Sequence, residues 1–433
     1  MKEKTLKSTK SVCTECYGIV DAVIFEENGS LYMRKNCPEH GESRVFFHGD
    51  PGFYRFCSRT TTALDRKFSE CGLSGCSSCA EHLPHVKTVM VEATERCNLS
   101  CPACMTNSNS RRTREITVEE LLARLERIPG RPAVLFCGGE PTVREDLPRL
   151  IRAVAGRGHP VKVASNGLKL ADEGYVRELK EAGLDWVLLQ TDGFSDEIYR
   201  KTRGGPMMEV KNEALRLLGR YGIKVCVAVM VVRGVNDTEL GRLVEFGMND
   251  ERVMHVGFVP IVTVGRNRFS RREDISSSEV MDGIERQTGG RITKRDFMVS
   301  KTAGRLLFSI TGNPNFQQKS CFFTLLVQKK GSGYFSVSRY LNPFFALWNF
   351  RLFFEFLRSF RRLSRWDEIP RMAKFKVITI EEHRDQESVD LLDANLCNKV
   401  VVTEKGFVPV CIYNTVYRRE SWLPEDVVET GGA

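Results

Sequence analysis

The chain has 433 residues, of which 42% are hydrophobic and 27% charged, so it is long enough for two or three globular domains. No run of about 18 uncharged apolar residues occurs, and we therefore predict no membrane-spanning helix. The net charge of +9 is modest for this length. It permits an anionic substrate or a membrane surface, and we expect no nucleic-acid partner.

Cysteine is unusually frequent, with 15 in the chain, and most lie in short clusters in the first third of the sequence. The amino-terminal segment MKEKTLKSTK is polar and lacks the apolar stretch of a secretory signal, so we expect a cytoplasmic protein with reduced thiols. Clustered cysteines in that compartment indicate metal binding rather than disulfides.

Residues 13–40 have the pattern of a small metal-binding module. Two short alternating runs, DAVIFE and SLYMRK, flank a Glu-Asn-Gly turn, which predicts a β-hairpin. A chelating pair stands at each end of the hairpin, and the two pairs are Cys13, Cys16, Cys37 and His40. This layout is typical of a zinc ribbon or a rubredoxin-like iron site, with Cys57 as an alternative to His40. So small a module needs its metal to stay folded.

From residue 86 onward, short apolar runs rich in β-branched residues alternate with helix-like stretches. The runs are VKTVMVEAT, AVLFCGG, VKVASNG, DWVLLQTDG, KVCVAVMVV and VMHVGFVPIV. Helices are predicted between them, for example over 117–128 and 146–156. Six strand–helix repeats predict a parallel α/β sheet with functional groups at the carboxyl ends of its strands. Because a closed barrel needs eight repeats, we expect an open, partial (β/α)6 TIM-like barrel.

The rest of the chain predicts a polar linker with a helix over 266–310, followed by a carboxyl-terminal domain. A stretch rich in phenylalanine and arginine follows Asn342 and Pro343, which suit a helix cap and a first helical residue. This stretch fits either a helix at a membrane surface or one that packs on the barrel. The last apolar block predicts a hairpin with Cys397 and Cys411 on its two arms. The expected domains are a metal module over 1–55, a cysteine segment over 56–85, the barrel over 86–310 and a carboxyl-terminal substrate or auxiliary-cluster domain over 311–433.

The sequence CNLSCPAC follows the first strand of the series and places three cysteines in one loop: Cys97, Cys101 and Cys104. A cubane iron–sulfur cluster normally takes four thiolates, so three leave one iron open to chelate another molecule. After the second strand comes a Gly-Gly-Glu run at 138–140. Its glycines allow the backbone to approach a ligand closely, and its glutamate offers a carboxylate to a cationic amine.

At these motifs the chain resembles the radical SAM superfamily, whose signature is CxxxCxxC followed by a GGE strand end. The resemblance covers roughly residues 86–265. It implies a 4Fe–4S cluster on the three catalytic cysteines, S-adenosylmethionine bound at the open iron, and reductive cleavage to a 5′-deoxyadenosyl radical. It also implies a reducing partner such as ferredoxin or flavodoxin. The implied cofactor-binding residues are Gly138, Gly139, Glu140, Ser165, Asn166, Gln190 and Asp192, the last four of which also suit ordinary strand-end turns.

A further group of cysteines precedes the barrel, in the segment CGLSGCSSCAEH: Cys71, Cys76 and Cys79. Three thiolates so close together predict an auxiliary 4Fe–4S cluster completed by a distant ligand. A zinc site that includes the nearby His82 is the alternative. The candidates for the distant ligand, and for a second auxiliary cluster, are Cys57, Cys321, Cys397 and Cys411.

The order of these motifs resembles the archaeal tetraether lipid synthase and pterin methylase-like group and its bacterial relatives. This resemblance spans nearly the whole chain and depends most on the CPEHG and CNLSCPAC motifs. It implies carbon–carbon bond formation or modification at unactivated carbon of a lipid, as an oxidoreductase or transferase of lipid biosynthesis in contact with a membrane surface. One alternative is methylation or other radical modification of a soluble substrate such as a pterin or a peptide. The other is a non-catalytic iron–sulfur electron-transfer module, which the intact Glu140 and loop cysteines disfavour.

Overall fold

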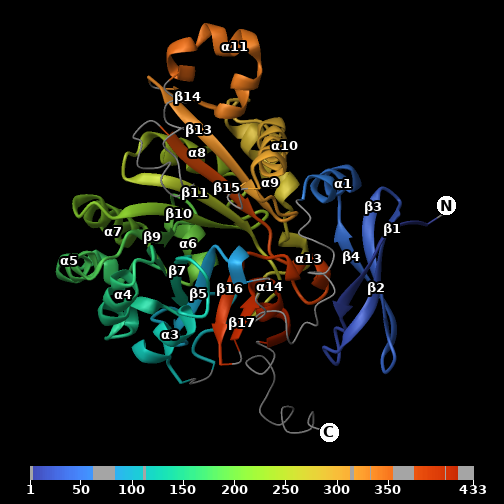
Figure 1. Ribbon diagram of the computed structural model, residues 1–433, viewed down its shortest axis with the longest axis horizontal. Coiled ribbons are helices and arrows are strands. Elements are labelled where there is room, and N and C mark those ends of the chain that lie inside the picture. Colours follow the sequence, from blue (N-terminus) through green and yellow to red (C-terminus); the bar gives the residue numbers. More distant parts are fainter. Residues whose placement is uncertain are drawn as a thin grey trace.

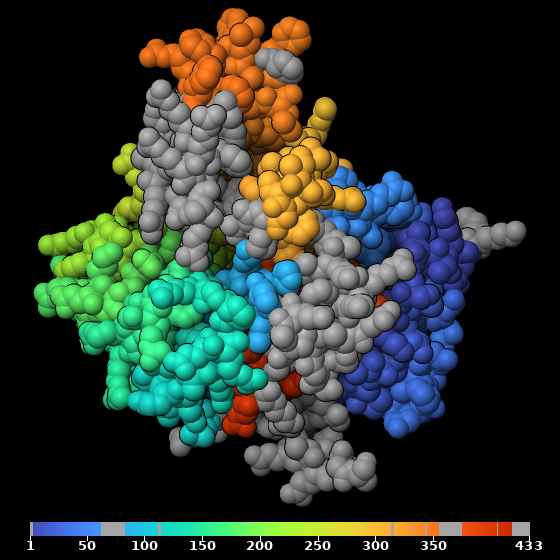
Figure 2. Space-filling model, in the orientation of Figure 1, coloured from blue at the N-terminus to red at the C-terminus, as the bar shows by residue number. Residues whose placement is uncertain are grey.

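The computed structural model describes residues 3–61, 83–110, 114–312, 316–331, 333–354, 375–404 and 406–417. Figure 1 shows a small amino-terminal sheet beside a large sheet wrapped by helices, with a short helical segment projecting at the top. Figure 2 shows the same segment, in orange, as an extremity of the molecule. No helix in these ranges combines the length and the hydropathy that crossing a bilayer requires.

The amino-terminal sheet has four antiparallel strands in chain order: β1 (Lys4–Val12), β2 (Ile19–Glu27), β3 (Ser30–Cys37) and β4 (Gly41–His48). Strands β2 and β3 are the predicted hairpin. Asn28 and Gly29 between them both have positive φ, 51° and 76°, as a two-residue type I′ turn requires. Helix α1 (Pro51–Thr60) leads away from this sheet.

Four side chains of this sheet and its loops converge on one point: Cys13, Cys16, Cys37 and His40. Their ligand atoms all lie within 4.8 Å of one another. The sulfurs of Cys16 and Cys37 are 3.8 Å apart, and Nδ1 of His40 lies 3.5 Å from the Cys37 sulfur. Zn–S bonds of about 2.3 Å in tetrahedral geometry separate two sulfurs by about 3.8 Å, so the group fits one tetrahedral ion. Cys57, the alternative to His40, lies in α1 and is not part of the group.

Strand β1 attaches this module to the carboxyl-terminal part of the chain. The Lys7 ammonium donates to the carboxylates of Asp390 and Asp393 at 2.5 and 2.7 Å. The Ser11 hydroxyl donates to the Val389 carbonyl at 2.8 Å. Two segments that are almost 400 residues apart, 383 between Lys7 and Asp390, therefore share an interface.

The large sheet has 11 strands, and the predicted six form its parallel centre: β5 (Thr88–Thr94), β7 (Ala133–Gly138), β8 (Val161–Ser165), β9 (Trp186–Gln190), β10 (Lys224–Val231) and β11 (Val253–Pro260). The helices between them are α3 (Val118–Leu125), α4 (Leu147–Gly156), α5 (Glu173–Ala182), α6 (Asp196–Arg203), α7 (Met208–Arg220) and α8 (Leu240–Asn249). Helix α3 begins with a capping box between Thr117 and Glu120. The predicted open α/β partial barrel is confirmed.

After β11 the chain forms α9 (Ser277–Gln287) and α10 (Lys294–Thr311) and then returns to both edges of the sheet. The returning strands are β13 (Phe322–Lys330), β14 (Gly333–Ser336), β15 (Phe375–Glu381), β16 (Lys399–Thr403) and β17 (Gly406–Pro409). Strand β15 pairs parallel with β11, and β16 pairs parallel with β5. Strands β13, β14 and β17 run antiparallel outside them. The described strands of the predicted carboxyl-terminal domain (311–433) thus pair with the barrel sheet, and the domain boundary itself stays a prediction.

The two faces of the central strands differ in chemistry. Alternate residues such as Val163 and Val227 are buried in the main hydrophobic core together with the surrounding helices. Along each strand, the residues that alternate with these buried ones face the inside of the barrel, because successive side chains of a strand point to opposite faces. Two of these are Lys162 and Lys224, whose ammonium groups lie 5.7 and 5.3 Å from the centre of the Trp186 ring. Polar groups therefore line part of the barrel interior.

The metal group of the amino-terminal sheet gives a direct test. We expect Cys37→Ser to lose the metal of this module, because the variant replaces one thiolate of a closed four-ligand site. The amino-terminal strands should then be cut faster in limited proteolysis, since the module has only a small apolar core of its own. The measurement is metal content per chain together with the cleavage rate within residues 1–50.

The matched control is Cys226→Ser, which removes a buried thiol outside the four-ligand group. It should leave the metal of the module in place. Full metal retention in Cys37→Ser would contradict the assignment.

Candidate functional site

The three clustered cysteines lie in a loop at the carboxyl ends of the parallel strands, directly after β5. Asn109 closes this loop, because its Oδ1 accepts from Cys97 N at 2.8 Å and its Nδ2 donates to Cys97 O at 3.0 Å. The two-residue strand β6 (Ala103–Cys104) within the loop pairs with β12 (Arg266–Asn267), which follows β11. The loop follows the first of the six central strands and pairs with the segment after the sixth, so both ends of the strand series hold it in place.

The loop thiols suit a cluster better than a single ion. Cys101 is only 9% exposed. The three thiols do not gather within 4.8 Å as the ligands of the amino-terminal module do. A cluster binds each cysteine through a different iron, which requires the wider spacing. Burial alone would raise the pKa of Cys104, but hydrogen bonds with Ser108 and Thr106, at 3.2 and 3.3 Å, lower it. The residues present fit a 4Fe–4S cluster with three protein thiolates.

Two glycines bring the end of β7 against the backbone of the cysteine loop. Gly139 N donates to Thr94 O at 2.8 Å, and Glu140 N donates to Arg96 O at 2.9 Å. A Cβ atom on Gly139 would stand 2.3 Å from Arg96 O, and one on Gly138 would stand 2.5 Å from Thr94 O. Only glycine permits both contacts. The two glycines therefore allow a close approach to the cysteine loop, and their approach to a ligand stays a prediction.

The Glu140 carboxylate is enclosed, with the residue only 2% exposed. It accepts hydrogen bonds from Thr142 Oγ1 at 2.7 Å, Ser165 Oγ at 2.9 Å and Asn166 N at 2.7 Å. Burial raises the pKa of Glu140, and these hydrogen bonds oppose that shift. Asn166 Nδ2 donates to Asn98 Oδ1 in the cysteine loop at 2.7 Å. Three predicted cofactor residues thus form one network between the ends of β7 and β8 and the loop.

The last two predicted cofactor residues have different surroundings. Asp192 is fully buried and pairs at two points with Arg203, at 2.6 and 2.9 Å. Its Oδ1 also accepts from Met230 N at 3.1 Å, so this carboxylate positions neighbouring protein groups. Gln190 ends β9 on the inner face of the barrel and is partly exposed. No group in the described part of the chain hydrogen-bonds to its side-chain amide, which leaves that amide available to a ligand.

Arg203 is a site residue that the sequence did not reveal. It ends α6, and a Cβ on the next residue, Gly204, would stand 3.5 Å from Ser100 O in the cysteine loop. Burial raises the pKa of the Cys101 thiol, and the neighbouring Arg203 guanidinium opposes this effect. A cation beside a thiolate stabilises the charged form, as a metal ligand requires. The segment YRKTRGG contains three basic residues, and only the fold distinguishes Arg203 from the other two.

Two more basic residues lie close to the loop, and sequence reasoning singled out neither. Half-buried Arg266 donates from Nε to Cys101 O in the loop at 2.9 Å. Buried Lys211, on α7, donates to the carbonyl of Asn166 at the end of β8. Burial lowers the pKa of Lys211 to about 7, with a smaller contribution from Arg203. Arg266 therefore holds the loop directly, whereas Lys211 holds the strand end beside it.

A second set of predicted cysteines comes together where the two edges of the large sheet approach each other. Cys321 precedes β13, Cys397 precedes β16, and Cys411 follows β17. Burial raises the pKa of Cys321 and of Cys411; nearby Cys397 raises both further, and Cys321 adds to the shift of Cys411. His383 Nδ1 lies 3.9 Å from the Cys411 sulfur. Cys71, Cys76 and Cys79 lie outside the described residues.

The glycine contact at the end of β7 predicts the behaviour of Gly139→Ala. We expect this variant to lose most of its loop-bound iron, because the new methyl group would push the Arg96 carbonyl, and with it the cysteine loop, out of place. Iron and sulfide content after anaerobic reconstitution is the measurement. Gly205→Ala is the matched control, since a Cβ at Gly205 meets nothing within 4 Å and its backbone is not left-handed. Equal iron content in the two variants would show that the contact is dispensable.

Comparison with known families gives two matches along the chain. Residues 91–247 match the Radical SAM superfamily, and residues 5–49 match the HMPTM N-terminal zinc ribbon domain. Among curated proteins, the chain is 34% identical over 307 residues to a 7,8-dihydro-6-hydroxymethylpterin dimethyltransferase of Methanocaldococcus jannaschii, covering 67% of this chain and 60% of that protein. It is 30% identical to an Fe-coproporphyrin III synthase of Methanosarcina barkeri, over 46% of this chain and 49% of that protein. The chain thus spans less than two thirds of the length of these relatives.

Among solved structures, the chain is similar to methylornithine synthase, with 20% identity, a TM-score of 0.39, and coverage of 55% of this chain and 69% of that one. The family matches coincide with the two sites already described, the cysteine loop and the four-ligand module. The chain therefore contains a radical SAM superfamily domain, which implies a 4Fe–4S cluster and S-adenosylmethionine, and an amino-terminal zinc ribbon domain.

Proposed function

We propose that this radical SAM enzyme methylates or otherwise modifies a soluble, reduced pterin-like heterocycle. The observation that carries the proposal is the match to the Methanocaldococcus jannaschii dimethyltransferase, which extends over 67% of this chain. The matched stretch of 307 residues is longer than the radical SAM domain at residues 91–247. The proposal corresponds to the soluble-substrate alternative of the sequence analysis.

The interior of the barrel supports a planar, polar substrate. Beside Trp186 and its two lysines lie Cys226 and His255, which are paired across β10 and β11. His255 Nε2 lies 2.7 Å from Thr379 Oγ1 on β15. Polar groups beside an aromatic ring suit a planar, polar heterocycle better than a wholly apolar lipid chain.

The lipid substrate expected from the sequence gains no support from the two curated relatives described above. Their names refer to a pterin and to a porphyrin. We therefore place lipid modification second to heterocycle modification.

The proposed binding of S-adenosylmethionine uses the carboxyl ends of the strands. The three loop cysteines, Cys97, Cys101 and Cys104, would hold a 4Fe–4S cluster, which would supply the electron for reductive cleavage of S-adenosylmethionine to methionine and a 5′-deoxyadenosyl radical. The backbone at Gly138–Glu140 borders this place. Ser165 and Asn166 hold the adjoining edge through the enclosed Glu140. Gln190 would offer its side-chain amide, which has no hydrogen-bond partner among the described residues, from inside the barrel.

A first experiment tests the radical chemistry and the substrate together. We expect Cys101→Ala to abolish formation of 5′-deoxyadenosine, because it removes one of three thiolates, while the metal of the amino-terminal module stays bound. Wild-type protein with a reducing partner should turn over S-adenosylmethionine faster with a 7,8-dihydropterin than with phospholipid. Arg216→Ala, an exposed change on α7, is the control and should behave as wild type. Normal cleavage by Cys101→Ala would refute the cluster site, and turnover with phospholipid alone would refute the heterocycle.

We also propose that Cys321, Cys397 and Cys411 hold an auxiliary 4Fe–4S cluster. Buried cations support an anionic cluster there, because Lys301 and Lys319 are both close enough to Cys321 to interact with its charge. His383, next to Cys411, or a cysteine of segment 71–79 would complete the ligand set. Such a cluster would pass electrons or hold a substrate radical.

Iron analysis tests the auxiliary cluster separately from turnover. The triple variant with serine at Cys321, Cys397 and Cys411 should contain about four fewer irons per chain than wild type, since one cubane is lost. The radical cluster should remain, visible in the electron paramagnetic resonance spectrum of the reduced protein with S-adenosylmethionine. Unchanged iron content in a folded triple variant would rule the auxiliary site out.

A further inference from the structure

A group of large apolar side chains lies open on the segment after β14, around helix α11 (Pro343–Trp348). Phe344 is 84% exposed and Trp348 is 86% exposed. We call the whole group the aromatic platform, and its members are Leu341, Phe344, Leu347, Trp348, Phe350 and Phe354. Figures 1 and 2 show this segment at the upper extremity of the molecule, in orange. A soluble monomer rarely exposes so many large apolar groups side by side without a function.

The platform is held in place by a second layer of aromatic rings beneath it. Phe345 packs edge-on against Phe335, with 5.1 Å between ring centres, and Tyr340 lies 5.2 Å from Phe353. The Tyr340 hydroxyl donates to Gln328 Oε1 at 2.7 Å. These contacts anchor one set of rings to the sheet and leave the other set outside. The exposed rings therefore belong to an ordered surface.

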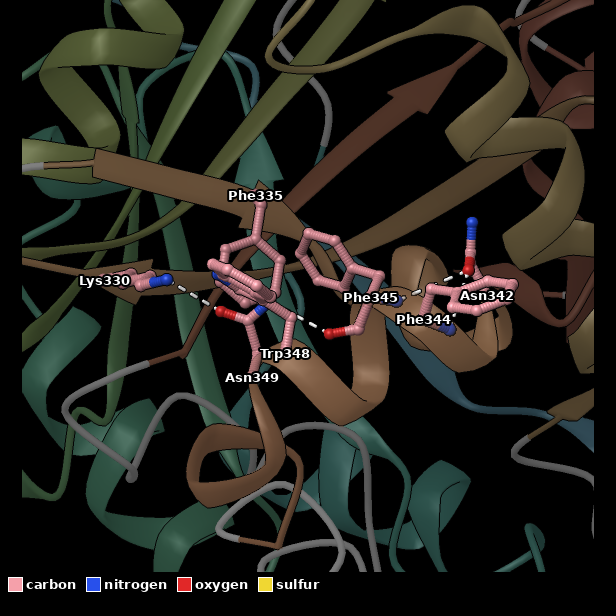
Figure 3. Close-up of a pocket in the computed structure, with 7 residues that line it drawn as sticks. All are labelled: Lys330, Phe335, Asn342, Phe344, Phe345, Trp348 and Asn349. Atoms are coloured by element: carbon pink, nitrogen blue, oxygen red, sulfur yellow. Dashed lines mark hydrogen bonds between the residues drawn. The ribbon is translucent and has the colours of Figure 1, made fainter.

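Polar caps fix the helix of the platform at both ends. The Asn342 side chain accepts from the backbone of Phe344 at 3.0 Å, which is the predicted cap. The Lys330 ammonium donates to Asn349 Oδ1 at 2.7 Å. Figure 3 shows these residues around a hollow of about 580 Å³, with the rings of Phe345 and Trp348 beside it. The hollow gives the platform an apolar recess with a cation on its rim.

The charge of this segment has a single sign. Between Phe322 and Phe354 the sequence contains four basic residues and no acidic one: Lys329, Lys330, Arg339 and Arg351. Lys330 and Arg351 are exposed beside the apolar group. Large apolar rings bordered by lysine and arginine match the boundary of an anionic bilayer, where rings enter the acyl region and cations meet phosphate groups. Pairing with a second copy of the same face would bring like charges together, which disfavours a symmetric dimer.

The platform lies at the end of the barrel opposite the cysteine loop. Strand β13 runs antiparallel to β15, so that Phe322 pairs with Glu381 at the carboxyl end of β15 and Gln328 pairs with Phe375 at its amino end. The chain leaves β13 for β14 and the platform on the amino-end side. A surface bound there would leave the carboxyl edge, with its cluster loop, free. Docking at the platform is thus separate from the cluster loop at the carboxyl ends of the strands.

We propose that the aromatic platform docks this enzyme on the surface of a bilayer that contains anionic lipid, with Phe344 and Trp348 inserted at the interface. Insertion of the rings supplies the apolar part of the binding free energy. Lys330 and Arg351 supply the preference for anionic headgroups. The enzyme then works on its substrate at the membrane surface, with its cluster edge turned to the solution.

Vesicle co-sedimentation of the full-length protein tests this proposal. Wild type should bind vesicles of phosphatidylcholine with phosphatidylserine, and bind vesicles of phosphatidylcholine alone much more weakly. The double variant Phe344→Ser/Trp348→Ser should lower binding about tenfold or more, because two fully inserted rings are lost. Lys330→Glu/Arg351→Glu should remove the preference for phosphatidylserine. Phe46→Ser, which changes an exposed aromatic residue on the amino-terminal sheet, is the matched control and should bind as wild type.

Several outcomes would overturn the proposal. Equal vesicle binding by wild type and the Phe344→Ser/Trp348→Ser variant would show that the platform is not the contact. Absence of vesicle binding by wild type, together with a dimer in sedimentation that this variant abolishes, would assign the face to a second copy of the chain. Formation of 5′-deoxyadenosine in solution should be the same in wild type and variant, so the result does not depend on the proposed substrate.

Discussion

The close contact between the end of β7 and the cysteine loop is the constraint from which the rest of the site follows. Gly139 and Glu140 donate backbone hydrogen bonds to the loop carbonyls, and no side chain fits at position 139. This contact turns the Glu140 side chain inward, where an unpaired carboxylate would cost several kcal/mol, of the order known for buried polar groups. Ser165 and Asn166 donate hydrogen bonds to this carboxylate, and these bonds hold the end of β8 beside the loop.

The charges around the loop follow from the same enclosure. Thiolates that bind iron gather negative charge in a place from which water is largely removed, and an enclosed site needs nearby cations to offset it. Arg203 provides one next to Cys101, and Asp192 holds that guanidinium in a single orientation through two hydrogen bonds. Asp192 therefore contributes to the site through Arg203. The pairing with Arg203 gives Asp192 a supporting role at the cluster loop, while its predicted contact with the cofactor stays a prediction.

Local patterns in the sequence were sufficient for the features whose parts are close together in the chain. The four ligands of the amino-terminal module all lie within residues 13–40, and the six central strands follow one another with regular helices between them. The pairing of β15 and β16 with opposite edges of the sheet depends on strand order, which local alternation does not encode. Arg203 and Lys211 were missed for a related reason, since a basic residue on a helix is usually exposed and only burial against the loop gives these two their role.

The amino-terminal module also bears on the second group of cysteines. Its edge strand β1 holds the segment at 389–393 through Lys7 and Ser11, and its buried Lys35 donates to the Gln386 carbonyl at 2.9 Å. This segment continues through helix α13 (Leu391–Asn395) and reaches Cys397 two residues later. The chain that joins these contacts to Cys397 is thus short. The fold of the small sheet therefore helps to set the position of Cys397 at the edge of the barrel.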